Sequence, residues 1–405
     1  MFNAAVLGYG TVGSGVVQII NENADVISSR LHDTIKVKYV LDLREFDNDP
    51  VQKILVHDFN IIKDDPEVDI VVETMGGINP AYEFVKASLE AGKNVCTSNK
   101  ALVAAHGPEL LDIAEEHSVN FLFEASVGGG IPIIRPLKTS CAPEDILEIR
   151  GILNGTTNYI LTKMTDEGLN FADVLKDAQL KGFAERNPEA DIEGYDAARK
   201  IAILASLAYG RNVDFEDVYT EGITNISDTD IVYVKKLGGK IKLFGIAKKH
   251  EHGVTVSVVP MIIRPDDPLF NVDGVYNAIL VRGNMLGDVM FYGQGAGKLP
   301  TASAVVSDVM EAAKHRHINI KTVWSHEKLG LEPFGDTFSR FFVRLKGGRE
   351  VNEAKVAGLF KKIKTIDAGF PDEYAFITDQ MKESDFKNAM LDMDNVTISK
   401  IRADI

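Results

Sequence analysis

Residues 2–23 read FNAAVLGYGTVGSGVVQIINEN, and this stretch decides the fold of the first part of the chain. Residues 4–7 are apolar, which is typical of a buried parallel strand. Glycines then follow in the pattern G-x-G-x-x-G before a helix-like run, VVQII. Such glycines allow a tight turn and close approach to a pyrophosphate, which the helix N-terminus attracts. In this context the motif predicts a dinucleotide site, with a tight structural turn as the alternative. Its candidate residues are Gly8, Gly10, Thr11, Val12 and Gly13.

The segments that follow alternate between strand-like and helix-like patterns. Residues 35–42, IKVKYVLD, suit a second strand that ends at Asp42, and an acid in this position binds ribose hydroxyls. Further segments are 68–77 (VDIVVETMGG), 80–92 (PAYEFVKASLEAG), 94–103 (NVCTSNKALV), 110–117 (LLDIAEEH) and 120–134 (NFLFEASVGGGIPII). This alternation predicts an α/β fold with a Rossmann-type, doubly wound parallel sheet and a ligand at the carboxyl ends of its strands.

A second informative stretch is residues 181–200, KGFAERNPEADIEGYDAARK. Four of its acids could hold a substrate ammonium group, and they are Glu185, Asp191, Glu193 and Asp196. The last acid enters a helix, and helical geometry places Asp196 and Lys200 on one face because side chains at i and i+4 meet. A lysine held beside a carboxylate can carry a proton. The alternative is a surface helix with an ordinary Asp–Lys pair.

A second lysine, Lys100, is predicted in the loop after a strand, facing the cofactor crevice. Reduction of an aldehyde develops negative charge on oxygen, which a protonated lysine stabilises and then neutralises with its proton. Two lysines near one site are expected to lower each other's pKa. The residues by themselves therefore suit hydride transfer, with the nicotinamide carrying the hydride.

Several longer blocks resemble the homoserine dehydrogenase family. In chain order they are GYGTVGSGV, ETMGG, TSNKALVA, FEASVGGGIPII, GILNGTTNYIL, KGFAERNPEADIEGYDAARKIAILA and GQGAGKLPTASAVVSD. They extend from about residue 5 to about residue 310 in the family's order. NGTTNYIL and the segment ending in DAARK are the most specific of them.

The resemblance implies an NAD(P)-dependent oxidoreductase that interconverts L-aspartate 4-semialdehyde and L-homoserine, in threonine, methionine and isoleucine biosynthesis. Lys200 resembles the family's proton donor, Lys100 the second active-site lysine, and Asp196 the acid that orients the site. The residues that by resemblance bind the substrate are Glu185, Asp191 and Thr156.

The resemblance also bears on the cofactor, NADP or NAD, which Gly182 and Lys100 are expected to approach. Relatives often have Arg-Asp at the end of the second strand, whereas this chain has Leu41-Asp42, with Arg44 two residues on. Loss of the arginine favours NAD, while Arg44 remains able to reach the 2′-phosphate of NADP.

A monovalent-cation site, for sodium, is a further implication of the resemblance. It falls in the segment EASVGGGI and is built largely from backbone oxygens, which hard cations prefer. The matching residues are Glu124, Val127, Gly129 and Ile131. A plain tight turn is the alternative.

Composition agrees with an enzyme that acts on small molecules. The 405 residues suggest two or three domains. With 44 basic and 59 acidic residues the net charge is −15, which argues against nucleic acid and anionic membranes as partners. The chain lacks a basic leader and a long apolar stretch, and its two cysteines, Cys96 and Cys141, have no C-x-x-C spacing. We therefore expect a cytoplasmic protein.

The predicted domains are residues 1–135 for the cofactor, completed by about 301–330, and 136–300 for the substrate and dimerisation, of the α+β class. By resemblance the sheet of the second domain pairs two subunits, so a homodimer or homotetramer is expected. Residues 338–405 resemble a small α+β domain of the ACT type. GGREVNEAKVA stands where such domains have a Pro-Gly turn, which puts effector binding in doubt and leaves a degenerate packing module as the alternative.

Two other functions are compatible with the cofactor motif. Another amino-acid dehydrogenase would share the glycines without NGTTNY or DAARK. A non-enzymatic, nucleotide-binding regulatory protein is expected to lose the charged catalytic residues, and this chain retains them.

Overall fold

A computed structural model describes residues 1–405 of the protein, and its first sheet is parallel and six-stranded. The strand order is β3-β2-β1-β4-β5-β6, the doubly wound order in which a dinucleotide binds where the strand order reverses. Its strands are β1 (Phe2–Leu7), β2 (Ile35–Leu41), β3 (Leu55–Val56), β4 (Ile70–Glu73), β5 (Asn94–Thr97) and β6 (Phe121–Leu122). The Rossmann-type sheet predicted from the sequence is confirmed.

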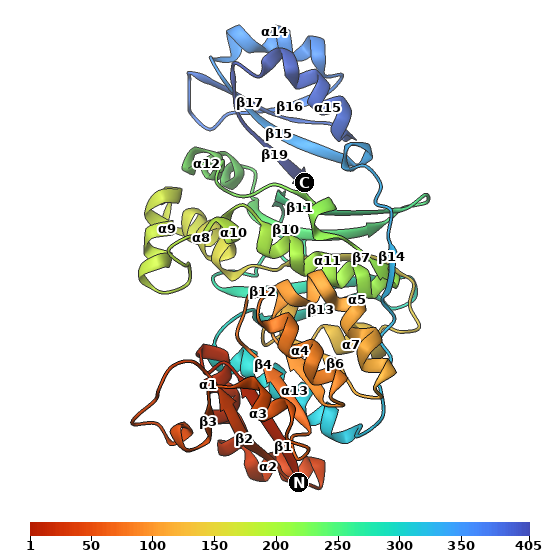
Figure 1. Cartoon of the computed structure of the whole chain (residues 1–405). Coiled ribbons are helices and arrows are strands. Elements are labelled where there is room, and N and C mark those ends of the chain that lie inside the picture. Colours follow the sequence, from red (N-terminus) through yellow and green to blue (C-terminus); the bar gives the residue numbers. More distant parts are fainter.

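Helices cover both faces of this sheet, because successive strand residues point to opposite faces. Ala4 and Val6 face α1, α2 and α13, whereas Ala5 and Leu7 face α3, α4 and α5. The helices of this part are α1 (Thr11–Glu22), α2 (Ala24–Leu31), α3 (Phe59–Lys63), α4 (Ala81–Glu90), α5 (Lys100–Glu116), α6 (Ala125–Gly128), α7 (Ile134–Thr139), α13 (Lys298–Lys314) and the short 3₁₀ helix η1 (Pro50–Ile54). Helix α13 thus returns from late in the chain to pack beside α1 (Figure 1).

The second sheet is mixed and eleven-stranded, with the main path β13-β12-β7-β10-β11-β19-β15-β17-β16. Its first half consists of β7 (Ile146–Ile152), β10 (Lys240–Lys249), β11 (Val254–Ile263), β12 (Tyr276–Gly283) and β13 (Gly287–Gln294), with β9 (Tyr219–Thr220) beside β11. The helices of this region are α8 (Gly155–Glu167), α9 (Phe171–Leu180), α10 (Glu189–Ile192), α11 (Tyr195–Tyr209), α12 (Asp228–Lys236) and η2 (Phe215–Asp217). Strands β8 (Arg211–Asn212) and β14 (Ser325–Lys328) form a separate pair.

The C-terminal part has the order strand, helix, strand, strand, helix, strand, which agrees with the α+β class expected for residues 338–405. Its elements are β15 (Phe338–Lys346), α14 (Arg349–Leu359), β16 (Ile363–Ile366), β17 (Glu373–Thr378), α15 (Glu383–Met390) and β19 (Thr397–Asp404), with the short β18 (Met381–Lys382), η3 (Phe334–Asp336) and η4 (Leu391–Met393). Both helices pack on one face of these strands around their own apolar cluster. The last strand pairs in parallel with β11, so these strands extend the mixed sheet, a continuity that the sequence does not predict (Figure 1).

Some local expectations were wrong or incomplete. Strand β13 and helix α12 were not predicted, and Lys100, predicted in a loop, is the first residue of α5. Strand β13 lies at a sheet edge with alternate residues exposed, so its apolar signal is weak. No helix combines the length and the apolar character needed to cross a membrane. The domain limits given above remain predictions.

Candidate active site

Both predicted active-site lysines form ion pairs with the Asp196 carboxylate. Lys100 Nζ lies 2.6 Å from its Oδ1, and Lys200 Nζ lies 2.9 Å from its Oδ2. Lys200 also donates to the Leu153 carbonyl oxygen at 2.8 Å. The Asp196 side chain is buried, whereas that of Lys100 remains 43% exposed. The predicted i,i+4 pair is therefore confirmed as an ion pair, and it is buried rather than on the surface.

Two helix starts bring these groups together. Asn99 precedes α5, where its Oδ1 accepts from Leu102 N at 3.2 Å and its Nδ2 donates to the Gly77 carbonyl at 2.5 Å. This cap fixes the first turn of α5, on which Lys100 lies. Gly194 precedes α11 with a φ of 86°, a conformation that glycine adopts without strain. Asp196 follows it in the first turn, where a carboxylate is favoured by the helix dipole.

Electrostatics at this site differ from the expectation that two lysines lower each other's pKa. Burial by itself would lower the pKa of Lys100, but the charge and hydrogen bond of Asp196, with the charge of Asp191, together outweigh burial and raise it. For Asp196, burial opposes ionisation, and the charges of Lys200 and Lys100 overcome it and hold the pKa well below its usual range. That prediction was wrong for Lys100 because the structure places a carboxylate between the two cations.

Asn154 is a site residue that the sequence did not single out. Its Nδ2 donates to Asp191 Oδ1 at 2.7 Å and to Asp196 Oδ2 at 2.9 Å. Its Oδ1 caps α8 by accepting from Thr157 N at 2.9 Å. One amide thus fixes two carboxylates relative to a helix start. The signal in the sequence was an asparagine between a strand and a helix, a preferred N-cap, in the specific block NGTTNY.

The three predicted substrate residues are placed differently. Asp191 joins the Asp196 centre through Asn154, and burial raises its pKa above the ordinary value, with Asp196 adding to the rise. Thr156 is buried, and its hydroxyl donates to the Phe183 carbonyl at 2.6 Å. Glu185 is exposed, and its carboxylate makes no hydrogen bond or ion pair. The structure therefore brings Asp191 to the centre and leaves Glu185 on the loop beside it.

The glycine-rich turn fits a dinucleotide. Gly8 has a φ of 89°, and a Cβ on Gly13 would lie 1.9 Å from the Gly8 carbonyl oxygen, so both positions require glycine. Space is open beside Gly10, which precedes α1 without a side-chain cap. Backbone N–H groups of the first turn, on Thr11 and Val12, are therefore free to receive an anion. Gly182, with a φ of 75°, likewise has open space around it.

Asp42 lies beside this turn, where its Oδ2 accepts from Tyr9 N at 2.8 Å. Arg44 folds back onto the same carboxylate through Nε at 2.9 Å and Nη2 at 2.8 Å. This fork holds the pKa of Asp42 well below its usual range. Leu41, by contrast, is buried in the core, so the cofactor-distinguishing groups at this strand end are Asp42 and Arg44.

Glu73, at the end of β4, is a second residue that the sequence left out. Its Oε2 accepts from the Thr97 hydroxyl at 2.6 Å and its Oε1 from Met75 N at 2.7 Å. Burial raises the pKa of this carboxyl group. Glu73 therefore joins the loops that follow β4 and β5, the second of which leads to Lys100. Its acidic side chain within an apolar strand, in the block ETMGG, was the available signal.

The predicted cation segment forms a buried loop around α6. The Glu124 carboxylate accepts from Ile133 N at 2.6 Å, Ile134 N at 2.7 Å and Arg135 N at 2.7 Å, so it caps α7. The backbone carbonyls of Val127, Gly129 and Ile131 accept no hydrogen bond, whereas the Glu124 carbonyl begins α6. Buried carbonyls are nearly always paired, so three free ones suit a cation held by oxygens.

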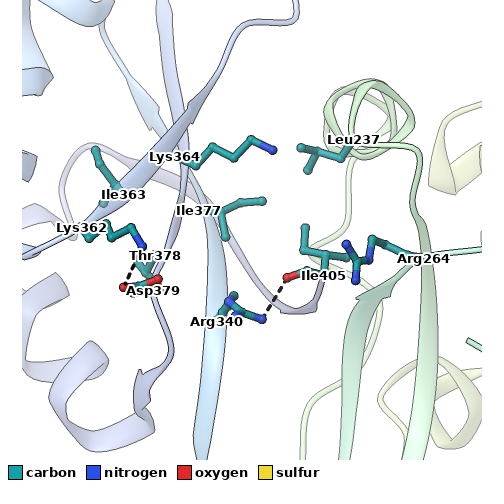
Figure 2. Close-up of a pocket in the computed structure, with 10 residues that line it drawn as sticks. All are labelled: Leu237, Arg264, Arg340, Lys362, Ile363, Lys364, Ile377, Thr378, Asp379 and Ile405. Carbon is teal, nitrogen blue, oxygen red and sulfur yellow. Dashed lines mark hydrogen bonds and ion pairs between the residues drawn. The ribbon is translucent and has the colours of Figure 1, made fainter. Parts of the chain in front are cut away.

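Two cavities lie elsewhere. One of about 650 Å³ is lined by strands from both halves of the mixed sheet, and its lining includes Arg150 and Arg402. The other, of about 300 Å³, is lined by strands of the C-terminal part and by Leu237 and Arg264. In this cavity Arg340 donates to an oxygen of Ile405 at 3.0 Å (Figure 2). Neither cavity contains a predicted site residue.

Comparison with known proteins gives one family. Residues 8–124 match the model of the homoserine dehydrogenase NAD-binding domain, and residues 132–310 match that of homoserine dehydrogenase. The chain is 38% identical to homoserine dehydrogenase of Bacillus subtilis, over 97% of this chain and 95% of that protein. It is 49% identical to the enzyme of Synechocystis sp., over 75% of this chain and 72% of that protein.

A solved structure agrees with these matches. The crystal structure of a homoserine dehydrogenase from Thiobacillus denitrificans superposes with a TM-score of 0.91 at 34% identity, over 100% of this chain and 98% of that chain. Family models, sequence relatives and fold therefore converge, and the chain belongs to the homoserine dehydrogenase family, NAD(P)-dependent oxidoreductases that act on a small-molecule substrate.

Proposed function

We propose that the Asp196 centre is where this chain interconverts L-aspartate 4-semialdehyde and L-homoserine. The observation that carries the proposal is the convergence of Lys100 and Lys200 on one buried carboxylate. An ordinary surface ion pair would be exposed to solvent, whereas the pair of Asp196 and Lys200 is buried, and a buried charge requires a partner. Here a single acid holds two cations at the junction of the two sheets, where an oxygen that gains negative charge can be stabilised.

The nicotinamide supplies the hydride when the cofactor is bound. Lys200, oriented by Asp196 and by the Leu153 carbonyl, donates a proton to the substrate oxygen as negative charge develops there. Lys100 stabilises the same charge, and its raised pKa keeps it protonated at neutral pH. Asp196 stays ionised and fixes the distance between the two ammonium groups.

Binding of the substrate amino acid is assigned to three residues. Asp191, half-buried and oriented by Asn154, pairs with the substrate ammonium, an interaction that offsets the cost of partly burying its charge. Glu185 lies on the exposed loop and closes over the ammonium when substrate is present. Thr156 contributes shape and its hydroxyl at the start of α8.

The cofactor is assigned to the glycine-rich turn, with either NAD or NADP accepted. The residues that hold it are Gly8, Gly10, Thr11, Val12, Gly13, Asp42, Arg44, Lys100 and Gly182. Asp42 receives the ribose hydroxyls of NAD, and Arg44, whose side chain is 61% exposed, is free to turn outward toward a 2′-phosphate.

A sodium ion is assigned to the backbone carbonyls of the loop around α6. Glu124, Val127, Gly129 and Ile131 supply the oxygens, and the Glu124 carboxylate stays on α7. The expected role is to rigidify the loop. Activity in sodium chloride, compared with choline chloride at equal ionic strength, tests the assignment. Equal activity and equal thermal stability in the two salts would count against a sodium site.

The proposal also covers the C-terminal module, the oligomeric state and the location of the protein. Residues 338–405 form an ACT-like module, supported by their strand–helix order, with two helices on one face. The chain assembles as a homodimer or homotetramer through the mixed sheet. It works in the cytoplasm, which agrees with two buried, unpaired cysteines, Cys96 and Cys141.

The deciding experiment is a steady-state assay of the purified protein with L-aspartate 4-semialdehyde and NADH or NADPH. We expect cofactor oxidation that depends on the semialdehyde, and L-homoserine as the product. Oxidation of another amino acid, with none of L-homoserine, would overturn the substrate assignment. Cofactor binding without turnover would favour a regulatory protein instead.

A further inference from the structure

Arg402, on the last strand of the chain, makes an unusually complete set of contacts. Its guanidinium donates to Glu383 through Nε at 2.6 Å and Nη2 at 3.0 Å. Its Nη1 donates to Glu221 Oε2 at 2.7 Å. The stacked rings of Tyr219 and Phe334, 4.0 Å apart, lie against the same guanidinium, and the Arg402 side chain is only 8% exposed. A rigid, buried fork packed against stacked aromatic rings fixes the position of its partners.

Glu221 lies outside the C-terminal part, one residue after strand β9. Its backbone N–H continues the pairing with β11 by donating to the Val258 carbonyl at 2.8 Å. Arg402 therefore binds the side chain of a residue whose backbone is joined to the mixed sheet. Glu383 is 9% exposed and Glu221 is 33% exposed, so the contact with Glu221 is the more accessible arm of the fork.

The residues after Glu221 press against the substrate segment. Ile223 N donates to the Ile192 carbonyl at 2.8 Å. A Cβ on Gly222 would lie 2.2 Å from that same oxygen, so the backbones touch here. Ile192 ends α10, the helix that carries Asp191, and its neighbour Glu193 leads into the glycine that starts α11. Arg402 is thus linked through Glu221, and through the contact of residues 222–223 with Ile192, to the segments that carry Asp191 and Asp196.

We propose that Arg402 is a positioning residue for the amino-acid site, acting through Glu221. By holding the segment from 219 to 223 in place, it holds α10 and the start of α11, and thereby the carboxylate of Asp191. The inference deepens the proposed function, because it rests on the role of Asp191 in substrate binding. It also gives the C-terminal part a mechanical task that needs no bound effector.

The sharpest test removes one arm of the fork. Glu221→Gln keeps the shape of the side chain, leaves the Arg402–Glu383 pair intact and removes the negative charge that Arg402 binds. Glu216→Gln is the matched control, since Glu216 is an exposed acid on the preceding 3₁₀ helix without an ion pair. Both variants are assayed for KM of L-homoserine, KM of the cofactor, kcat and thermal stability, and for hydrogen exchange at the Ile223 amide.

We expect Glu221→Gln to raise the KM for L-homoserine by about 2- to 30-fold, the range typical of residues that touch neither ligand. Exchange at Ile223 is expected to become faster, while the KM of the cofactor stays unchanged. Glu216→Gln is expected to change none of these. An unchanged KM for L-homoserine in Glu221→Gln, or an equal rise in both KM values, overturns the proposal.

Two further variants separate this inference from its premises. Asp191→Asn is measured in parallel, because an unchanged KM there would overturn the substrate-binding role of Asp191 itself. Arg402→Lys retains the charge and loses the fork, so it should reproduce the rise in KM for L-homoserine. A folded Arg402→Lys protein with wild-type KM would show that the fork positions nothing.

Discussion

The Nζ of Lys100, on the helix that follows β5 of the parallel sheet, lies 2.6 Å from Oδ1 of Asp196, on a helix that packs against the mixed sheet. The two halves of the molecule therefore meet in one ion pair. Because Asp196 also holds Lys200, movement of either helix alters the spacing of both ammonium groups. The spacing of these three charged groups consequently depends on how the two sheets pack.

Replacing Lys200 with Ala is expected to lower kcat by about 10²- to 10⁴-fold, the usual contribution of general acid–base catalysis. The KM should change little, because the lost interaction is made mainly in the transition state. Lys176→Ala, at an exposed lysine of α9, serves as the control. If Lys200→Ala keeps a near-normal kcat across the pH range, the proton donor must instead be Lys100 or a bound water.

Asp196→Asn should shift the pH dependence of aldehyde reduction. In the native protein Asp196 raises the pKa of Lys100 against the effect of burial, so this lysine keeps its proton at alkaline pH. Without the charge, burial is unopposed and the pKa of Lys100 falls. The rate of the variant is therefore expected to decline at lower pH than that of the wild type. A kcat profile whose alkaline limb does not move would contradict this role for Asp196.

Glu185→Ala tests whether an exposed loop acid closes on the substrate. We expect a marked rise in KM for the amino acid with little change in kcat, since the proposed contact is made equally in the ground and transition states. Glu189→Ala removes a similarly exposed acid four positions later and should be silent. If both variants retain the wild-type KM, the ammonium is held by Asp191 without help from Glu185.

Arg44→Ala tests cofactor choice. Leu41→Arg would restore the arginine that relatives often have, but Leu41 is buried, and an arginine there would disturb the core. Arg44 is exposed and releases Asp42 when it is removed, so the variant should use NADPH less well relative to NADH. The ratio of kcat/KM for the two cofactors is the measurement, with Arg30→Ala on α2 as the control. An unchanged ratio places the 2′-phosphate elsewhere.

Threonine at millimolar concentration is expected to leave the rate unaffected. The turn between β15 and α14 is closed from within, because the buried Asn352 side chain donates to the carbonyls of Lys346 at 3.1 Å and Gly347 at 2.6 Å. The assay uses the full chain, since removing β19 would expose the edge of β11. Saturable inhibition by threonine would show that the module binds an amino acid after all.

The sequence by itself determined the elements whose signals are local. The G-x-G-x-x-G turn between a strand and a helix requires glycine for reasons confined to a few residues, and a Cβ at Gly13 would collide with Gly8. Spacing of four along a helix likewise determined the pair of Asp196 and Lys200. Alternation of strands and helices determined the parallel sheet.

Only the tertiary structure decided what those elements bring together. It placed Asp196 between two lysines and so reversed the expected change in the pKa of Lys100. It made Asn154 the link between two acids, and it joined the C-terminal strands to the mixed sheet, where Arg402 reaches Glu221. These contacts join residues far apart in the chain, and their geometry depends on how whole sheets and helices pack, which no local pattern encodes.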